Sequence, residues 1–156
     1  MPIKNFKQLK GQGRMAPDKK RIYIVDDDVS VCRALKILLV TCGFAVETFS
    51  SAEEYFIVVP DSAAGCLIMD IHLPGLSGWE ALQRLATSGS RRPVIIITAD
   101  KNENLKQKAL KAGAVGLLQK PFYDNELIEM INQNYQAGED GIEKKPKTRK
   151  LKRKRE

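Results

Sequence analysis

Five polar side chains stand where apolar runs of the sequence end, and together they could perform chemistry on phosphate. Asp26 and Asp27 follow one run, Asp70 ends a second, Thr98 ends a third, and Lys120 follows a fourth. Carboxylates placed close together repel one another unless a cation is bound, so we expect a divalent ion among them. All-oxygen ligation with an incomplete protein shell favours Mg²⁺. A carboxylate beside a metal ion and a Lys is suited to attack phosphorus, so the set predicts an aspartyl-phosphate site.

This interpretation depends on the whole set. Asp70 is followed closely by a Pro and a Gly, and such an acid alone is more typical of a loop cap than of a functional site. Compatible residues at three other strand ends favour a functional site at Asp70 over a loop cap. Within the acidic run, Asp28 is interpreted as a helix-start residue. The side chain of His72 is expected to be exposed, and Trp79 is expected to be a packing residue.

Five apolar runs of strand type alternate with five segments of helix type. The strand-type runs are residues 22–25, 45–49, 66–70, 93–98 and 115–119. The helix-type segments lie between residues 29 and 43, 50 and 60, 77 and 88, 105 and 113, and 124 and 131. We expect Ser50 with Glu53 to cap the second helix and Asp124 to cap the fifth. Strand and helix alternation with short connections predicts an α/β fold, a doubly wound five-stranded parallel sheet between two helical layers. In such a sheet the carboxyl ends of all strands share one edge, which would bring the polar residues together.

Charge is distributed unevenly along the 156 residues, whose formal net charge is +7. Residues 1–20 carry six Lys and Arg against one Asp, and residues 142–156 carry nine against two Glu, so the segment between them is acidic. We predict a basic flexible arm (1–20), one folded domain (21–137) and a disordered basic tail (138–156). About 20 residues after the last helix are too few for a helix-turn-helix output domain, so we expect a single-domain protein.

The cysteine pattern and the hydropathy indicate a cytoplasmic protein. Cys32, Cys42 and Cys66 are odd in number and lie inside apolar patterns, which favours reduced thiols among core residues over disulfides. No apolar run approaches the ~18 residues of a membrane span, and no secretory signal is evident.

Residues 21 to 136 resemble a response-regulator receiver domain. The acidic cluster, Asp70 with its loop Leu73-Pro74-Gly75-Leu76-Ser77-Gly78, Thr98-Ala99 and Lys120-Pro121-Phe122 follow one another in the family order. The amino-acid sequence of this loop most resembles the FixJ-like branch of the family. The resemblance implies the CheY-like, flavodoxin-like strand order 2-1-3-4-5 and a cis bond between Lys120 and Pro121.

The resemblance also implies a role for each site residue. Asp70 would be the phosphoacceptor, Asp27 and Asp70 would bind Mg²⁺ directly, and Asp26 would hold a coordinated water. His72 would offer its backbone carbonyl to the metal, Lys120 would pair with the phosphoryl group, and Thr98 would move to contact it.

One position departs from the family pattern. Leu117 stands three residues before Lys120, where the family usually has an aromatic switch residue. We therefore expect switching that is weak or that uses another route.

The resemblance favours a single-domain response regulator of two-component phosphorelay signalling over an enzyme. A histidine kinase or phosphotransfer protein would be the donor, with slow autodephosphorylation. Phosphorylation would change partner affinity, including a homodimer through the fourth helix, fifth strand and fifth helix. One alternative is an aspartyl-nucleophile phosphohydrolase, although such enzymes need an acid two residues after the nucleophile, where this chain has His72.

The basic tail leaves a further alternative open, a nucleic-acid-binding protein with the folded domain as a platform. Clustered Lys and Arg release counterions from a phosphate backbone, and the absence of interleaved aromatics predicts weak sequence preference. A solvated tail with no partner, another polyanion such as an acidic protein, and an anionic membrane surface are also compatible with these charges.

Overall fold

The computed structural model describes residues 19–135. Most of the predicted arm (1–20), the last two residues of the predicted domain (21–137) and the whole predicted tail (138–156) lie outside the described residues. Those boundaries therefore stay predictions.

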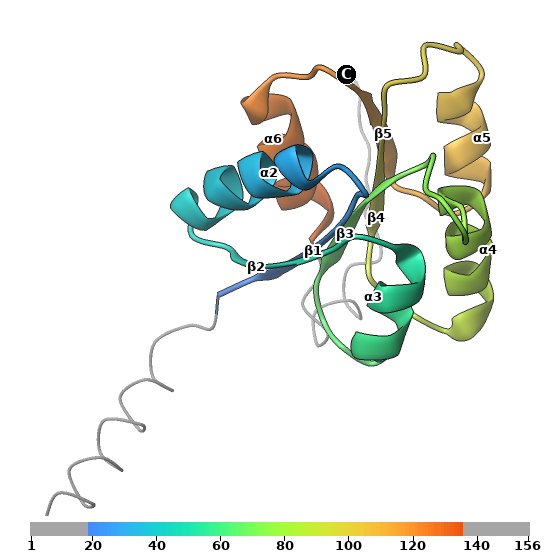
Figure 1. Cartoon of the computed structure of the whole chain (residues 1–156), viewed down its shortest axis with the longest axis horizontal. Helices are drawn as coiled ribbons and strands as arrows, with labels where there is room; N and C mark the ends of the chain where they lie inside the picture. Colours follow the sequence, from blue (N-terminus) through green and yellow to red (C-terminus); the bar gives the residue numbers. More distant parts are fainter. Residues whose placement is uncertain (1–18, 136–156) are drawn as a thin grey trace, which may run out of the picture.

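Five strands and five helices alternate along the described chain, as the hydrophobic pattern predicts (Figure 1). The strands are β1 (Arg21–Val25), β2 (Ala45–Phe49), β3 (Cys66–Asp70), β4 (Val94–Thr98) and β5 (Gly116–Gln119). The helices are α2 (Val29–Thr41), α3 (Ala52–Val58), α4 (Gly78–Ser88), α5 (Leu105–Lys111) and α6 (Asp124–Asn134). Within residues 19–135, none of the helices combines the length and hydrophobicity that crossing a membrane requires.

The strands form one parallel sheet in the order β2-β1-β3-β4-β5, which confirms the predicted fold. Every residue of β3 and β4 is buried, as expected for apolar strands covered on both faces. The register pairs Asp70 with Ile97 and Thr98 with Gln119. These strands therefore end almost level with one another at the carboxyl edge of the sheet.

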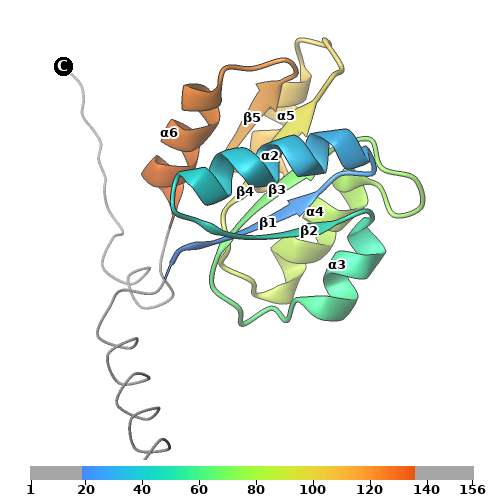
Figure 2. The same ribbon diagram turned by 60° about the vertical axis from the view of Figure 1, so that its left-hand side comes forward.

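Two layers of helices cover the sheet (Figures 1 and 2). Helices α2 and α6 lie on one face, and α3, α4 and α5 lie on the other. Alternate residues of a strand point to opposite faces. In β1, Ile22 and Ile24 accordingly join the core under α2 and α6, and Tyr23 and Val25 join the core under α3, α4 and α5. The two cores hold the strand ends in fixed relative positions.

Two helix starts next to the site follow from their capping residues. The carboxylate of Asp28 accepts hydrogen bonds from the N–H groups of Ser30 (2.9 Å) and Val31 (3.3 Å) at the start of α2, which confirms its predicted helix-start role. The Ser77 hydroxyl accepts from the Glu80 N–H at 3.1 Å, and the Glu80 carboxylate accepts from the Ser77 N–H at 3.0 Å. This capping box begins α4 immediately after the loop that follows β3.

The predicted cap of α3 is wrong by one residue. Ser51, and not Ser50, is the N-cap, and its hydroxyl accepts from the Glu54 N–H at 3.1 Å. The Glu54 carboxylate accepts from the Ser50 N–H at 3.0 Å. The sequence holds two overlapping Ser-x-x-Glu patterns, and the helix uses the second. Glu53 is thereby left available for a contact outside the helix.

The predicted cap of α6 is also wrong by one residue. Tyr123 is the N-cap, and its N–H donates to the Glu126 carboxylate at 2.9 Å. Asp124 is instead the first helical residue, where a negative charge is still favoured by the helix dipole.

Gly78 allows α4 to begin directly against the end of β3. Its N–H donates to the carbonyl of Ile71 at 3.0 Å. A Cβ atom at this position would lie 2.5 Å from the carbonyl oxygen of Asp70 and 2.6 Å from Cα of Ile71. Both of these atoms belong to backbone, which cannot rotate away as a side chain could.

We predict that Gly78→Ala lowers the free energy of unfolding by about 2 kcal/mol, because overpacking against backbone outweighs the better helix propensity of Ala. Gly89→Ala is the matched control, since Gly89 has a left-handed φ of 87° but a Cβ atom added there would meet no atom within 4 Å. The control should lose about 1 kcal/mol through backbone strain alone. Urea unfolding followed by Trp79 fluorescence measures both, and equal losses would contradict the steric account.

Candidate functional site

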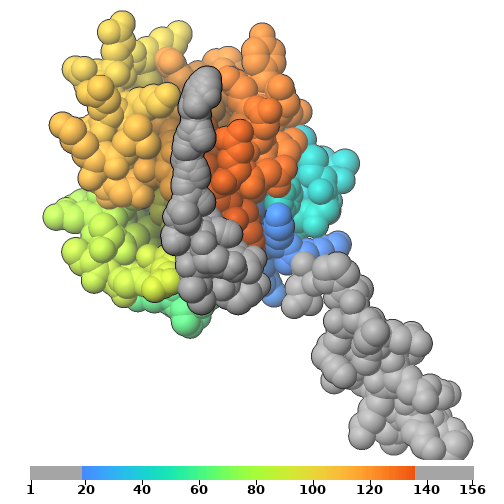
Figure 3. All heavy atoms as spheres, turned by 180° about the vertical axis from the view of Figure 1, so that it is seen from behind, coloured from blue at the N-terminus to red at the C-terminus, as the bar shows by residue number. Residues whose placement is uncertain are grey.

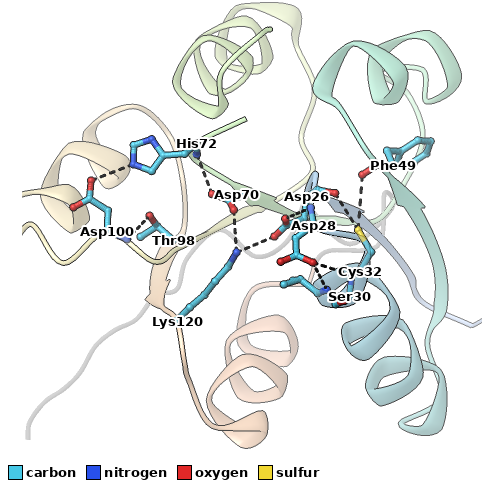
Figure 4. Close-up of polar contacts among 11 residues, drawn as sticks. Asp26, Asp28, Ser30, Cys32, Phe49, Asp70, His72, Thr98, Asp100 and Lys120 are labelled. Atoms are coloured by element: carbon cyan, nitrogen blue, oxygen red, sulfur yellow. Dashed lines mark hydrogen bonds and ion pairs between the residues drawn. The ribbon is translucent and has the colours of Figure 1, made fainter. Parts of the chain in front are cut away.

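The structure brings three of the sequence-predicted residues into direct contact at the carboxyl edge of the sheet (Figure 4). The Lys120 ammonium donates to Oδ2 of Asp26 at 3.0 Å and to Oδ2 of Asp70 at 2.9 Å. These residues come from the ends of three different strands, β1, β3 and β5. The backbone N–H of Lys120 also donates to the backbone carbonyl of Thr98 at 2.7 Å, which connects the end of β5 to the end of β4. The Lys120-Pro121 bond is cis, as the resemblance implied.

Asp27 completes an acidic cluster with Asp26 and Asp70. One carboxylate oxygen from each residue lies within 4.8 Å of the others. Asp26 and Asp70 are buried, whereas Asp27 is exposed. Three carboxylates around one ammonium carry an excess of two negative charges, which makes the cluster a suitable place for a further cation.

Burial perturbs the ionisation of this cluster. Burial raises the pKa of Asp26 above its usual value, although hydrogen bonds from the Asp28 N–H and from Lys120 partly oppose the rise. For Lys120, burial alone would lower the pKa, but the hydrogen bonds and negative charges of Asp70 and Asp26 outweigh it, so the pKa is raised. The Lys120 side chain is therefore a cation at neutral pH.

The same local turn fixes a polar side chain at three strand ends. The N–H two residues later donates to Oδ1 of Asp26 at 2.9 Å, to Oδ1 of Asp70 at 2.9 Å, and to Oγ1 of Thr98 at 3.0 Å. Such turns are typical of Asp, Ser and Thr. Each turn thereby orients the side chain that accepts its hydrogen bond.

Thr98 and His72 make their side-chain contacts with Asp100, a residue that the sequence analysis did not single out. Thr98 is fully buried, and its hydroxyl accepts from the Asp100 N–H. The His72 ring is exposed, as predicted, and points toward Asp100, with Nε2 3.1 Å from Oδ2 (Figure 4). The Asn102 N–H and His72 together hold the pKa of Asp100 below its usual value. This pair links the loop after β3 to the loop after β4.

A signal for Asp100 exists in the sequence. It stands two residues after Thr98, at the same offset as Asp28 from Asp26 and His72 from Asp70. Its partner could not be inferred, because the pair joins two loops that are 28 residues apart.

The cysteines are all free, and two of them are buried. Burial raises the pKa of Cys66 to about 12 and also raises the pKa of Cys32, whose thiol donates to the carbonyl of Asp26 at 3.2 Å. Cys42 is exposed at the end of α2, so its expected place in the core is wrong. Within the described residues the structure therefore offers no thiolate beside the acidic cluster.

Trp79 and Leu117 lie on the α3, α4 and α5 side of the sheet. Both are partly buried against the core on that side, which supports the predicted packing role of Trp79. The Lys108 ammonium lies 4.3 Å from the centre of the Trp79 ring, and this contact joins α5 to α4. Trp79 follows Gly78 directly, so its fluorescence can report on the loop after Asp70.

Comparison with known proteins identifies the family of the chain. The family model for the response regulator receiver domain matches residues 22–132. The transcriptional regulatory protein FixJ of Bradyrhizobium diazoefficiens is 36% identical over 121 residues, which are 78% of this chain and 59% of FixJ. The response regulator protein TmoT of Ectopseudomonas mendocina is 34% identical over 152 residues, which are 97% of this chain and 69% of TmoT.

A solved structure extends the likeness to three dimensions. Full-length FixJ from B. japonicum superimposes with a TM-score of 0.70 at 36% identity, over 76% of this chain and 58% of that one. The chain thus spans less than two thirds of FixJ, and the expected single-domain organisation stays a prediction. Fold and sequence agree, and the chain belongs to the response regulator receiver domain family of two-component signalling.

Proposed function

We propose that this receiver domain accepts a phosphoryl group on Asp70. The observation that carries the proposal is the placement of Lys120, which bridges Asp70 and Asp26 inside an acidic cluster. Asp70 is largely buried but remains partly accessible, as a phosphoacceptor must be. The ammonium lies where it can pair with a phosphoryl group on Asp70.

The donor set fits Mg²⁺. The cluster offers carboxylate oxygens alone, and its excess negative charge favours a divalent cation with mixed protein and water ligands. Asp27 and Asp70 would hold the ion directly, Asp26 would hold one of its waters, and His72 would add its backbone carbonyl. When bound, Mg²⁺ supplies positive charge that offsets the charge of the phosphoryl oxygens.

Transfer would proceed by attack of an Asp70 carboxylate oxygen on the phosphorus of a phosphohistidine. The new bond joins oxygen to phosphorus, the bond between phosphorus and the donor imidazole breaks, and the leaving nitrogen keeps the electron pair and takes a proton. Lys120 would stabilise charge on the transferred group, and Thr98 would turn its hydroxyl toward it. A histidine kinase or phosphotransfer protein would be the donor in the cytoplasm, where the free cysteines would stay reduced.

The readout would use the surface formed by α5, β5 and α6, whose helices appear in gold and orange in Figure 3. Turning Thr98 toward the phosphoryl group would break its hydrogen bond from Asp100 and loosen the loop before α5. Because Leu117 is not aromatic, the effect of phosphorylation would reach this surface through the loop before α5. Phosphorylation would change the affinity of that surface for partners, including a second copy of the chain.

A phosphohydrolase is less well supported. The His72 side chain is 62% exposed and is engaged by Asp100, so it does not stand over Asp70 as a leaving-group acid would. We expect self-phosphorylation by small acyl phosphates and slow hydrolysis of the aspartyl phosphate, not repeated turnover.

A second candidate function is nucleic-acid binding through the basic tail, favoured by nine Lys and Arg within residues 142–156. Its partners would be phosphate backbones, and the receiver domain would act as a platform or as a switch.

The first prediction from the proposed function tests phosphoryl binding at Asp70. Mg²⁺ with beryllofluoride, which stands in for a phosphoryl group, should change the Trp79 fluorescence of the wild-type protein. Asp70→Asn should abolish the change, and Asp61→Asn, at an exposed acid outside the cluster, should preserve it. A full response in Asp70→Asn would contradict the proposal.

The second prediction concerns the buried charge of Asp26. Its raised pKa means that the ionised form is disfavoured in the folded state, so this group reduces stability as the pH rises through its folded pKa. Without metal, Asp26→Asn should raise the free energy of unfolding at pH 7, and the gain should vanish at acid pH, below the pKa of an Asp carboxyl in the unfolded chain. Mg²⁺ should stabilise the wild type more than this variant.

Asp27→Asn is the control for that measurement, because Asp27 is exposed. Its metal-free stability should change by less than about 0.5 kcal/mol. A loss of stability in Asp26→Asn at pH 7 would show that the carboxylate is not strained by burial.

The third prediction tests the tail. Deleting residues 142–156 should remove binding to duplex DNA, and wild-type affinity should fall with salt by about 0.9 logarithmic units per tenfold change for each phosphate contacted. Asp70→Asn should bind like the wild type if the domain is only a platform. Unchanged affinity after the deletion would exclude the tail as the binding segment.

A further inference from the structure

Glu53 contacts the loop that follows Asp70 from a different element. It lies in the first turn of α3, and its Oε2 accepts a hydrogen bond from the Leu76 N–H at 2.9 Å. This hydrogen bond is the main reason that the pKa of Glu53 lies below its usual value. The carboxylate is therefore charged at neutral pH and stabilised by the loop.

The loop backbone fits closely around this carboxylate. Gly75 has a left-handed φ of 74°, and a Cβ atom there would lie 2.5 Å from Oε2 of Glu53. A side chain at this position would displace the carboxylate from the Leu76 N–H. The lack of a side chain at Gly75 therefore leaves room for the Glu53 carboxylate in this position.

Other contacts hold the two ends of the same loop. The Gly78 N–H donates to the Ile71 carbonyl and so joins the two ends. His72 contacts Asp100 at the first end, and Ser77 belongs to the capping box of α4 at the second. The middle of the loop, at Gly75 and Leu76, is exposed or partly exposed and is held by Glu53. The middle of the loop is therefore held by a residue of α3, which is a different element. The same loop begins at His72, whose backbone carbonyl is a predicted ligand of the metal.

We propose that Glu53 is a positioning residue for the Asp70 site, which it serves by holding the loop of residues 72–77 in the shape that binds Mg²⁺. The inference rests on the proposed function of Asp70. Glu53 acts through the loop and is not itself a ligand of the metal or of the phosphoryl group. Residues that orient metal ligands from outside typically change metal affinity by ~10- to 100-fold, and a contact one step further away should act more weakly.

The test measures Mg²⁺ affinity by titration of Trp79 fluorescence in the full chain, and the rate of phosphorylation by acetyl phosphate at subsaturating Mg²⁺. Glu53→Ala should weaken Mg²⁺ binding by about 3- to 10-fold and slow phosphorylation in proportion. Glu53→Gln keeps an oxygen acceptor for the Leu76 N–H without the charge, so it should stay within about twofold of the wild type.

Glu54→Ala is the matched control for damage to α3. It removes the contact with the Ser50 N–H, so it should lower stability while leaving Mg²⁺ affinity within about twofold of the wild type. Equal Mg²⁺ affinities for Glu53→Ala and Glu54→Ala would overturn the inference. Equal weakening by Glu53→Gln and Glu53→Ala would also overturn it, because charge rather than position would then be responsible.

A double-mutant cycle tests the contact itself. Gly75→Ala should lower the melting temperature more in the wild type than in Glu53→Ala, where the clashing carboxylate is gone. Equal decreases would contradict the fit between the two residues. If the wild type binds no Mg²⁺ and takes no phosphoryl group on Asp70, the proposed function itself fails, whereas a normal wild type with an unaffected Glu53→Ala overturns only the inference.

Discussion

Repulsion among carboxylates at one edge of the sheet is the constraint on which the site depends. Asp26, Asp27 and Asp70 are held within reach of one cation. Within residues 19–135 the Lys120 ammonium is the one cationic group that forms an ion pair in the cluster, and it pairs with Asp26 and Asp70. A fold can keep such a cluster together only if rigid elements supply each member. Here four neighbouring strands end almost level, and apolar cores on both faces fix them. The excess negative charge of the cluster makes it a suitable place for a further cation.

The loops around the cluster show how that rigidity continues beyond the strands. One turn type recurs after β1, β3 and β4, and it fixes a carboxylate or a hydroxyl by a backbone N–H two residues later. Contacts from other parts of the chain then hold the loop after β3, with Asp100 bound to His72 and Glu53 bound to the Leu76 N–H. The Thr98 hydroxyl takes part in the turn after β4, so a change at Asp70 that draws Thr98 toward it would alter the loop before α5.

Local patterns in the sequence were sufficient for the succession of elements and for the strand-end residues, whereas the order of strands in the sheet came from the family resemblance. Alternation of apolar runs with amphipathic segments determines the order of elements, and the polar residues that end the runs meet once the sheet is parallel. The predicted N-caps of α3 and α6 were each wrong by one residue. Two overlapping Ser-x-x-Glu patterns precede α3, and the sequence alone does not distinguish adjacent residues as the N-cap of either helix. The contacts of His72 with Asp100 and of Glu53 with Leu76 join segments 28 and 23 residues apart, and no local pattern encodes them.

The most direct test of the account is a phosphotransfer experiment read by intact mass. Wild-type protein is incubated with a small acyl phosphate or a phosphorylated histidine kinase, with and without Mg²⁺, beside Asp70→Asn. The account predicts a mass gain of one phosphoryl group in the wild type, dependent on Mg²⁺ and absent from the variant. A gain of equal size in Asp70→Asn, or a wild type that takes up no phosphoryl group from either donor, would contradict it.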